Sequence, residues 1–155
     1  LTLAGHAAGV EHVAISPDGR NVATGSGDGT TRIWDISAEG SREVLTVAAD
    51  APAVAAAFDP AGARIAASFQ DGIARIWDAA TGTPGPTLLG HTGALWTIAF
   101  SPDGTLLATG GEEGPRAGAK LPPRPAVESN RFARPRVSAN AFECATTLFL
   151  QCETI

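Results

Sequence analysis

The sequence is poor in cysteine and has no methionine. Of its 155 residues only Cys144 and Cys152 are cysteines, which excludes the disulfide framework of a small secreted domain and makes free thiols the default. No apolar run reaches the ~20 residues of a membrane-spanning helix, and no basic and apolar leader opens the chain. Because methionine is absent, Leu1 is not expected to be a translation start, and we expect a longer parent chain. The sequence therefore predicts a soluble domain with a cytoplasmic location.

Positive charge is scarce too, and it is unevenly distributed. The formal net charge is −5, and residues 1–114 hold five Lys/Arg against thirteen Asp/Glu, whereas residues 115–155 hold six against three. An acidic surface argues against a protein built to hold nucleic acid. The first part contains all three Trp and 17 of the 18 Gly, and the second contains both Cys and five of the 11 Pro. We therefore expect one domain at 1–114 and a different, irregular tail at 115–155.

Residues 1–114 are internally repeated. Four short motifs recur in a common register: Gly-His at 5–6 and 90–91, Ser-Pro-Asp-Gly at 16–19 and 101–104, Asp-Gly at 28–29 and 71–72, and Ile-Trp-Asp at 33–35 and 76–78. A weaker Asp-Pro-Ala-Gly copy stands at 59–62. Several motifs that keep one order along the chain indicate a repeat architecture.

The segments between these motifs are typical of short strands. Continuous apolar runs at 54–58 and 98–100 are bounded by turn residues and suit strands buried on both faces. Pro-Asp-Gly suits a type I turn, and Asp-Gly suits a tight hairpin. Strands then turn over about every ten residues, which leaves no room for helices between them. The pattern predicts an antiparallel, all-β architecture.

The ordered set Gly-His, Ser-Pro-Asp-Gly, Asp-Gly and Trp-Asp resembles the WD-repeat (WD40) family of β-propellers, in which each repeat of ~40–45 residues supplies four strands of blade. The resemblance covers residues 1–114, or about two and a half repeats. It implies a partial propeller with blades at about 10–47 and 53–89 and an incomplete third blade from 94. The expected strands are 10–16, 21–25, 30–35, 43–47, 53–58, 64–68, 73–78, 87–89, 94–101 and 105–110. Residues 37–42 and 79–86 are expected to form solvated loops.

The resemblance also implies a hydrogen-bonded chain of Trp, Ser/Thr, His and Asp inside each blade. Such a chain gives the buried indole N–H a partner, whose loss costs ~1–3 kcal/mol. The residues carried over are Trp34, Thr24, His6 and Asp28 in the first blade, Trp77 and Asp71 in the second, and His91 and Thr109 in the third. The second blade has Ala67 and Ala49 at the Thr and His positions, and the third has Glu113 where Asp is expected.

A histidine beside an aspartate and a threonine is also compatible with a hydrolytic triad. The same set recurs once per blade, however, which favours a structural role over a catalytic one. The three histidines have no cysteine or second histidine at metal-ligand spacing. We therefore expect no catalytic residue, no metal site and no cofactor.

A binding surface is the better functional prediction. In the propeller geometry that the resemblance implies, the Gly-His loop and the Asp-Gly hairpin lie on one face, the top. The candidate contacts for a protein partner are Glu11, Gln70, Trp96 and Glu112, near Gly27 and Ala94. Trp96 is the most suggestive because tryptophan is enriched at binding hot spots. Packing between neighbouring blades remains an equal alternative for Trp96.

The repeat stops abruptly after Gly114. By register the third Trp-Asp is due at 119–120, where the sequence has Ala119-Lys120. Because composition changes at the same point, a reading-frame slip, an aberrant splice or a gene truncation is one hypothesis for the tail, and a genuine tail is the other. In a genuine tail, 115–136 is expected to be disordered. A solvated linker is favoured there over nucleic-acid contact through Arg124, Arg131, Phe132, Arg134 and Arg136. Residues 138–152 are compatible with a helix whose face carries Phe142, Ala145, Phe149 and Cys152.

A chain of about two and a half blades falls short of the roughly four to eight that close a propeller. Its end blades would leave apolar faces open, so the isolated chain is expected to self-associate or to pack against other blades of the same propeller. The sequence predicts a non-enzymatic scaffold for protein partners. The alternatives are a regulatory propeller segment of a larger kinase- or NTPase-containing protein, and a truncated product without independent function.

Overall fold

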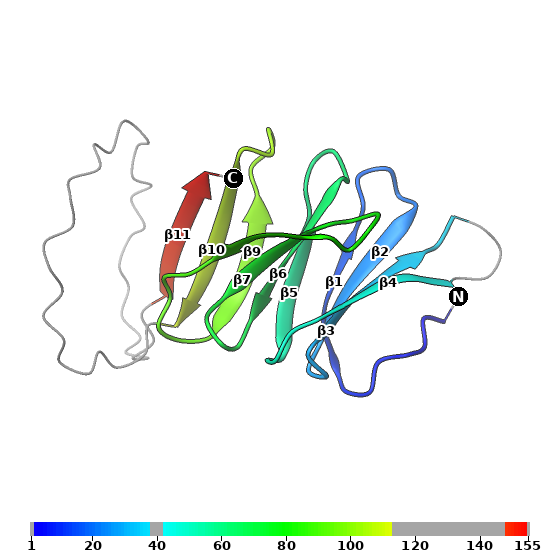
Figure 1. Ribbon diagram of the computed structural model, residues 1–155, viewed down its shortest axis with the longest axis horizontal. Helices are drawn as coiled ribbons and strands as arrows, with labels where there is room; N and C mark the ends of the chain where they lie inside the picture. The colour runs from blue at the N-terminus through cyan, green and yellow to red at the C-terminus, as the bar shows by residue number, and fades with distance from the viewer. Residues whose placement is uncertain (1, 38–41, 113–147, 155) are drawn as a thin grey trace, which may run out of the picture.

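The computed structural model describes residues 2–37, 42–112 and 148–154, and these residues form three β-sheets that stand side by side (Figure 1). Blade 1 contains β1 (Val10–Ile15), β2 (Asn21–Ser26), β3 (Thr30–Asp35) and β4 (Arg42–Ala48). Blade 2 contains β5 (Ala53–Phe58), β6 (Arg64–Phe69), β7 (Ala74–Asp78) and β8 (Pro84–Leu88). Blade 3 contains β9 (Leu95–Phe100), β10 (Leu106–Glu112) and β11 (Leu148–Thr154). In these ranges there is no helix that could cross a membrane.

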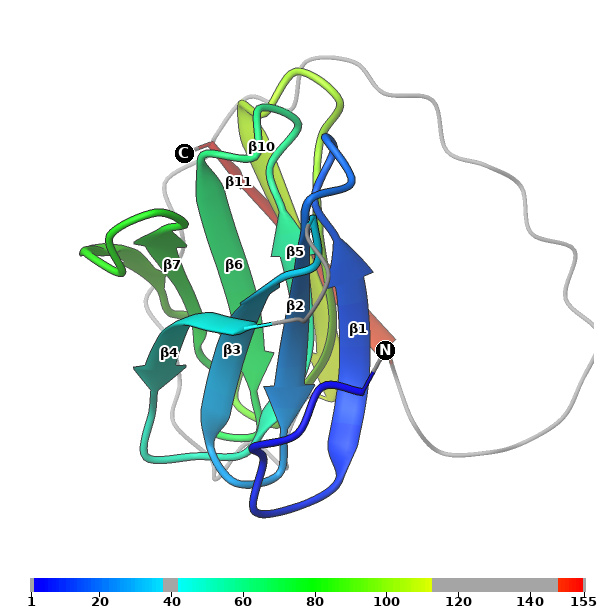
Figure 2. The same cartoon turned by 90° about the vertical axis from the view of Figure 1, so that its right-hand side faces the viewer.

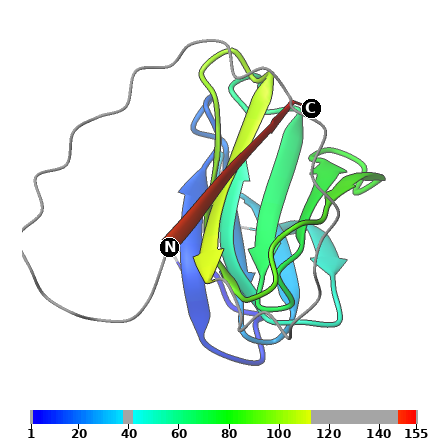
Figure 3. The same cartoon turned by 90° about the vertical axis from the view of Figure 1, so that its left-hand side faces the viewer.

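The strands of each blade are antiparallel, and strands adjacent in blades 1 and 2 are consecutive in the chain. The predicted all-β class with four-stranded antiparallel blades is therefore confirmed. The first strands β1, β5 and β9 are edge strands that lie next to one another, and β4 and β8 form the opposite edges (Figures 2 and 3). The described blades thus fan outward from β1, β5 and β9.

The Ser-Pro-Asp-Gly segments form tight turns between the first and second strands of a blade. In blade 3 the Ser101 hydroxyl donates to Asp103, whose carboxylate also accepts from the backbone N–H of Thr105 at 3.0 Å. These hydrogen bonds lower the pKa of Asp103 to about 2, and the bond from the Ser101 hydroxyl has the largest effect. Gly104 follows with φ +70°, a left-handed conformation that glycine adopts without steric cost. The motif therefore encodes its own turn through local hydrogen bonds.

The Asp-Gly hairpins need glycine because they touch the loop that enters the next blade. Gly29 has φ +81°, and a Cβ there would lie 2.8 Å from the carbonyl oxygen of Ala49. Gly72 has φ +79°, and its Cβ would lie 2.7 Å from the carbonyl oxygen of Gly93. Backbone contact of this kind admits no side chain. The hairpins after β2 and β6 therefore hold neighbouring blades in fixed relative positions at the top.

The core lies between the blades rather than inside any one of them. Between blades 1 and 2 the buried cluster is Ala23, Ile33, Val47, Ala53, Ala56, Ile65, Ala67, Phe69 and Trp77. Between blades 2 and 3 it is Ala55, Ala66, Ala74, Ile76, Leu95, Ile98 and Leu107. The abundant alanines allow the sheets to approach closely, while Phe69 and the branched side chains fill the remaining volume. Each sheet therefore depends on its neighbour to bury apolar surface.

Blade 3 takes its third strand from an unexpected part of the chain. β11 pairs with the whole of β10, with Leu106 opposite Thr154 and Glu112 opposite Leu148. It occupies the place in blade 3 that β3 and β7 occupy in the other blades. An unpaired edge of β10 would expose a row of N–H and C=O groups, which a strand satisfies and a helix does not. Pairing with β10 is thus the physical reason for a strand at this position.

Two expectations from the sequence are therefore wrong. Residues 148–154 are a strand, not part of an irregular tail or of a helix carrying Phe149 and Cys152; the other predicted tail residues, including Arg124 to Arg136, Phe142 and Ala145, lie outside the described ranges. β8 begins at Pro84, so the predicted loop at 79–86 is too long. Proline lacks an N–H, but β8 is an edge strand, where fewer ladder hydrogen bonds are required.

Candidate functional site

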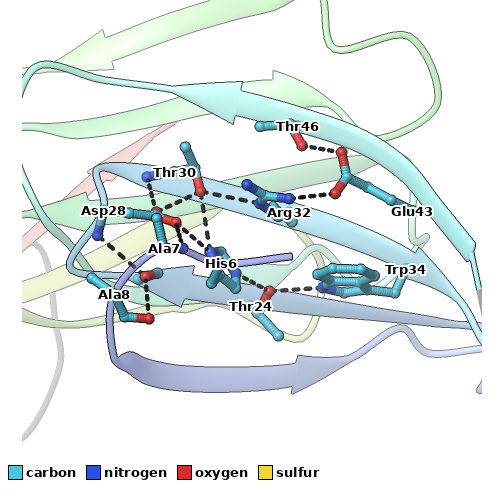
Figure 4. A network of polar contacts seen from close by, with 11 residues as sticks. His6, Ala7, Ala8, Thr24, Asp28, Thr30, Arg32, Trp34, Glu43 and Thr46 are labelled. Atoms are coloured by element: carbon cyan, nitrogen blue, oxygen red, sulfur yellow. Dashed lines mark hydrogen bonds and ion pairs between the residues drawn. The ribbon is translucent and has the colours of Figure 1, made fainter. Parts of the chain in front are cut away.

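The structure brings His6, Thr24, Asp28 and Trp34 of blade 1 together in one hydrogen-bonded chain (Figure 4). The Trp34 indole N–H donates to Thr24 Oγ1 at 2.8 Å. Thr24 Oγ1 lies 2.7 Å from His6 Nε2, and His6 Nδ1 lies 2.9 Å from Asp28 Oδ2. A carboxylate can only accept, so Nδ1 donates to Asp28 and Nε2 accepts from the Thr24 hydroxyl. Every polar atom of the chain is thereby paired.

Asp28 is the anchor of this chain because it accepts from several groups at once. Besides His6, it accepts from the backbone N–H of Ala7 at 2.9 Å and from the hydroxyl of Thr30 at 2.6 Å. Burial opposes ionisation of Asp28, but the hydrogen bonds from Thr30, Ala7 and His6 outweigh it and hold its pKa well below the ordinary value. Asp28 therefore ties the loop before β1 to the hairpin after β2.

The hydrogen-bonded chain of blade 1 lies in the interior of the structure. Thr24 is 4% exposed, and its hydroxyl lies between the Trp34 indole and the His6 imidazole. A substrate could reach it only after the blade had opened. Among the described residues there is also no group of three or more His, Cys, Asp or Glu side chains that could hold a metal ion.

Blade 2 replaces the hydrogen-bonded chain with aromatic contacts. The Phe69 ring meets Trp77 edge-on, with centroids 6.1 Å apart and planes at 71°; His6 meets Trp34 at the same 6.1 Å and at 65° in blade 1. The Arg75 guanidinium lies 4.7 Å from the Phe69 centroid and binds Asp71 at 2.8 Å. Trp77 and Asp71 are thus linked through Phe69 and Arg75.

The contribution of Phe69 was missed by sequence reasoning. The signal was present, because the repeat register places Phe69 opposite Ala53 where blade 1 has Ser26 opposite Val10. Phe69 is a large ring at a position that blade 1 gives to a small residue. Because blade 2 also lacks the histidine and the threonine of blade 1, the ring indicates an apolar substitute for both.

Blade 3 retains part of the polar pattern. His91 Nε2 lies 3.0 Å from Thr109 Oγ1, which matches the contact between His6 and Thr24. His91 Nδ1 is buried without a hydrogen-bond partner in the part of the chain that the structure describes. Glu113, the residue expected to replace aspartate, lies outside that part.

The residues predicted to contact a partner lie near the start of the first strand of a blade. We define the top face as the loops 3–9, 27–29, 49–52, 70–72 and 90–93 with the adjoining ends of β1, β5 and β9. The backbone N–H of Gln70 donates to Pro52 O at 3.1 Å, and that of Glu112 donates to Ala94 O at 2.9 Å. Gly27 makes the same bond to Gly9 O at 3.0 Å in blade 1. This recurring bond fixes Gln70 and Glu112 beside the residue that precedes β5 and β9.

Glu11 and Trp96 occupy equivalent β-bulges. The pairing register shifts between Val10 and His12 in β1 and between Leu95 and Thr97 opposite β10, so Glu11 and Trp96 are the extra residues. Sequence reasoning missed Val54, the extra residue of β5. A bulge leaves one residue unpaired and redirects its side chain. All three blades therefore place such a residue near the top of their first strand.

Trp96 is 46% exposed, whereas its neighbours Leu95 and Ile98 are 1% and 6% exposed and pack between blades 2 and 3. The interblade packing of β9 is thus supplied by the residues on either side of the bulge. Roughly half of Trp96 therefore remains accessible, and a partner can contact it there.

A family model described as "WD domain, G-beta repeat" matches residues 1–35, 42–78 and 82–114. This chain belongs to the WD-repeat family. Notchless protein homolog of Arabidopsis thaliana is 55% identical over 38 residues, which is 24% of this chain and 8% of that protein. Protein HIR1 of Yarrowia lipolytica is 32% identical over 115 residues, 67% of this chain and 8% of that protein. Protein FIZZY-RELATED 1 of Arabidopsis thaliana is 49% identical over 35 residues, 23% of this chain and 7% of that protein. The chain thus spans less than a tenth of the length of these curated relatives.

The first WD repeat is expected to lose stability in acid through Asp28. Its pKa in the folded chain lies below the ordinary 3.8, so the unfolded chain takes up the proton first as the pH falls. The stabilisation is therefore present above pH 3.8 and is lost progressively below it. Urea unfolding of wild type and Asp28→Asn between about pH 6 and pH 3 checks this. Asp28→Asn should lose less stability over that interval, whereas Val44→Ala, as a control at an exposed position, should parallel wild type.

Proposed function

We propose that this WD-repeat chain is a non-catalytic scaffold that binds a protein partner on its top face. Family membership supports a protein-interaction or regulatory role for a propeller. The observation that carries the choice of face is Trp96, which is 46% exposed at a β-bulge of a rigid sheet. Tryptophans in such positions supply large contact area at little entropic cost, and they dominate many interfaces.

The charges near Trp96 favour a partner with basic side chains. Glu112 is held beside Ala94, two residues from Trp96, by its backbone hydrogen bond, and Glu11 occupies the equivalent bulge in blade 1. Arg32 of β3 and Arg75 of β7 already bind Glu43 and Asp71. Complementary charge raises the association rate and selects among partners.

A library of phage-displayed peptides selected on the intact chain tests this proposal. Selected peptides should be rich in Lys and Arg, and Trp96→Ala should weaken their binding about 30-fold or more, as for a hot-spot residue. Glu112→Lys should weaken binding and reduce its salt dependence. Val44→Ala changes a side chain that is 43% exposed on β4 and should leave binding unchanged.

Three results would count against the top face: a library without binders, peptides without basic residues, or peptides that bind Trp96→Ala as tightly as wild type.

We also propose a cytoplasmic location, which is supported by the sequence alone through its two cysteines in 155 residues.

A further inference from the structure

Equivalent positions on the first strands of the blades differ greatly in exposure. The pairing register aligns Val10, Val13 and Ile15 of β1 with Ala53, Ala56 and Phe58 of β5 and with Leu95, Ile98 and Phe100 of β9. In blades 2 and 3 these residues pack against the preceding blade, and Ala56 and Ile98 are 1% and 6% exposed. In blade 1 Val10, Val13 and Ile15 are 49%, 56% and 64% exposed. We call this apolar stripe the leading face; blade 1, which carries it, stands in front in Figure 2.

The opposite side of blade 3 is similar in residue type to the surfaces of blades 1 and 2 that cover the apolar residues of β5 and β9. Ala23 of blade 1 and Ala66 of blade 2 belong to the two interblade clusters, with their cross-strand partners Ala14 and Ala57 packed against them. The residues in register in blade 3 are Ala99 and its partner Ala108. Ala99 is exposed and Ala108 is half-buried. We call this surface the trailing face; blade 3, which carries it, is nearest the viewer in Figure 3.

The two faces are complementary in side-chain size and in polarity. At both internal interfaces, alanines of one blade, together with larger residues such as Ile33 and Ile76, cover the stripe of the next. The leading stripe presents branched apolar side chains, the trailing face presents alanines, and none of the residues that define them is charged. The same kind of interface can therefore form between a leading and a trailing face.

We propose that a second copy of this chain docks head to tail, so that the leading face of each copy covers the trailing face of the other. The described residues of each copy form three sheets, and twice that number lies within the range of about four to eight blades in closed propellers. Head-to-tail contacts close into a ring when the rotation between copies permits it. Two such contacts bury both apolar faces of both copies, which removes the exposed patches from solvent.

The oligomeric state of the 155-residue chain and of matched variants tests the proposal. Wild type should have the mass of two chains in sedimentation equilibrium. Val13→Glu on the leading face and Ala99→Glu on the trailing face should each raise the dissociation constant about 100-fold or more, because each buries an unpaired charge. Leu89→Glu changes a residue that is 66% exposed and lies on neither face, so it should remain a two-chain species. Circular dichroism and thermal melting establish that each variant folds.

Mixing the two monomeric variants separates loss of contact from loss of fold. The Val13→Glu copy keeps an intact trailing face, and the Ala99→Glu copy keeps an intact leading face. An equimolar mixture should therefore form a two-chain species through one contact. The proposal is overturned by a folded wild-type monomer at all concentrations, whose leading face would then have another occupant, such as further repeats. It is also overturned by open filaments, by a dimer insensitive to Val13→Glu, or by a mixture that stays monomeric.

Discussion

Phe69→Ala is expected to lower the free energy of unfolding by about 3–5 kcal/mol. Phe69 is fully buried, and it is among the largest side chains that are. Its ring contacts Trp77 edge-on and lies beneath the Arg75 guanidinium. Truncation leaves a cavity between blades 1 and 2, and it removes the only contact through which blade 2, in the part that the structure describes, links its tryptophan to Asp71.

Urea unfolding monitored by tryptophan fluorescence measures this loss. Phe69→Leu conserves most of the volume but not the ring, so it should cost clearly less than alanine. Val44→Ala, at an exposed position, should change stability by less than about 0.5 kcal/mol. If Phe69→Ala costs no more than Val44→Ala, then Phe69 does not replace the missing polar chain.

Thr24→Val is expected to destabilise the protein by about 2–4 kcal/mol, because two buried polar groups lose their partner. The substitution keeps the shape of the side chain but removes the hydroxyl that accepts from Trp34 and contacts His6 Nε2. The indole N–H and the imidazole nitrogen would then be buried without compensation. Chemical denaturation gives the loss directly.

Thr109→Val in blade 3 is the matched control. Thr109 contacts His91, but the residue in register with Trp34 in that blade is Glu153, opposite Leu107. At this position blade 3 therefore has no indole N–H that would lose its acceptor. Thr109→Val should lower the free energy of unfolding by about half as much as Thr24→Val does. Equal costs for the two substitutions would show that the Trp34 bond contributes little.

The repeat register predicted most of the fold from the sequence because turn chemistry is local. Ser-Pro-Asp-Gly and Asp-Gly carry within four residues the hydrogen bonds and the positive φ that their turns need. Hairpins joined by such turns leave little freedom in strand order. The contacts of His6 with Thr24 and Asp28 could be anticipated for a different reason, because the resemblance to the WD-repeat family implies such a hydrogen-bonded chain.

What sequence reasoning missed depends on contacts between paired strands or on departures from the repeat. Phe69 acts through Trp77 and Arg75 only when β6 and β7 are paired. The exposure of Trp96 depends on a bulge whose partner is β10. The pairing of β11 with β10 follows from an open strand edge, and no motif marks residues 148–154.

The origin of β11 has a consequence for the order of folding. Blades 1 and 2 are built from strands consecutive in the chain, so each pairing closes only a short loop. β10 and β11 are separated in the sequence by residues 113–147. Bringing together two strands so far apart in the chain costs conformational entropy before any hydrogen bond between them forms. We therefore expect blades 1 and 2 to form first, while one edge of β10 is still unpaired. The rate of the last pairing is then expected to set how long that edge stays available to other strands.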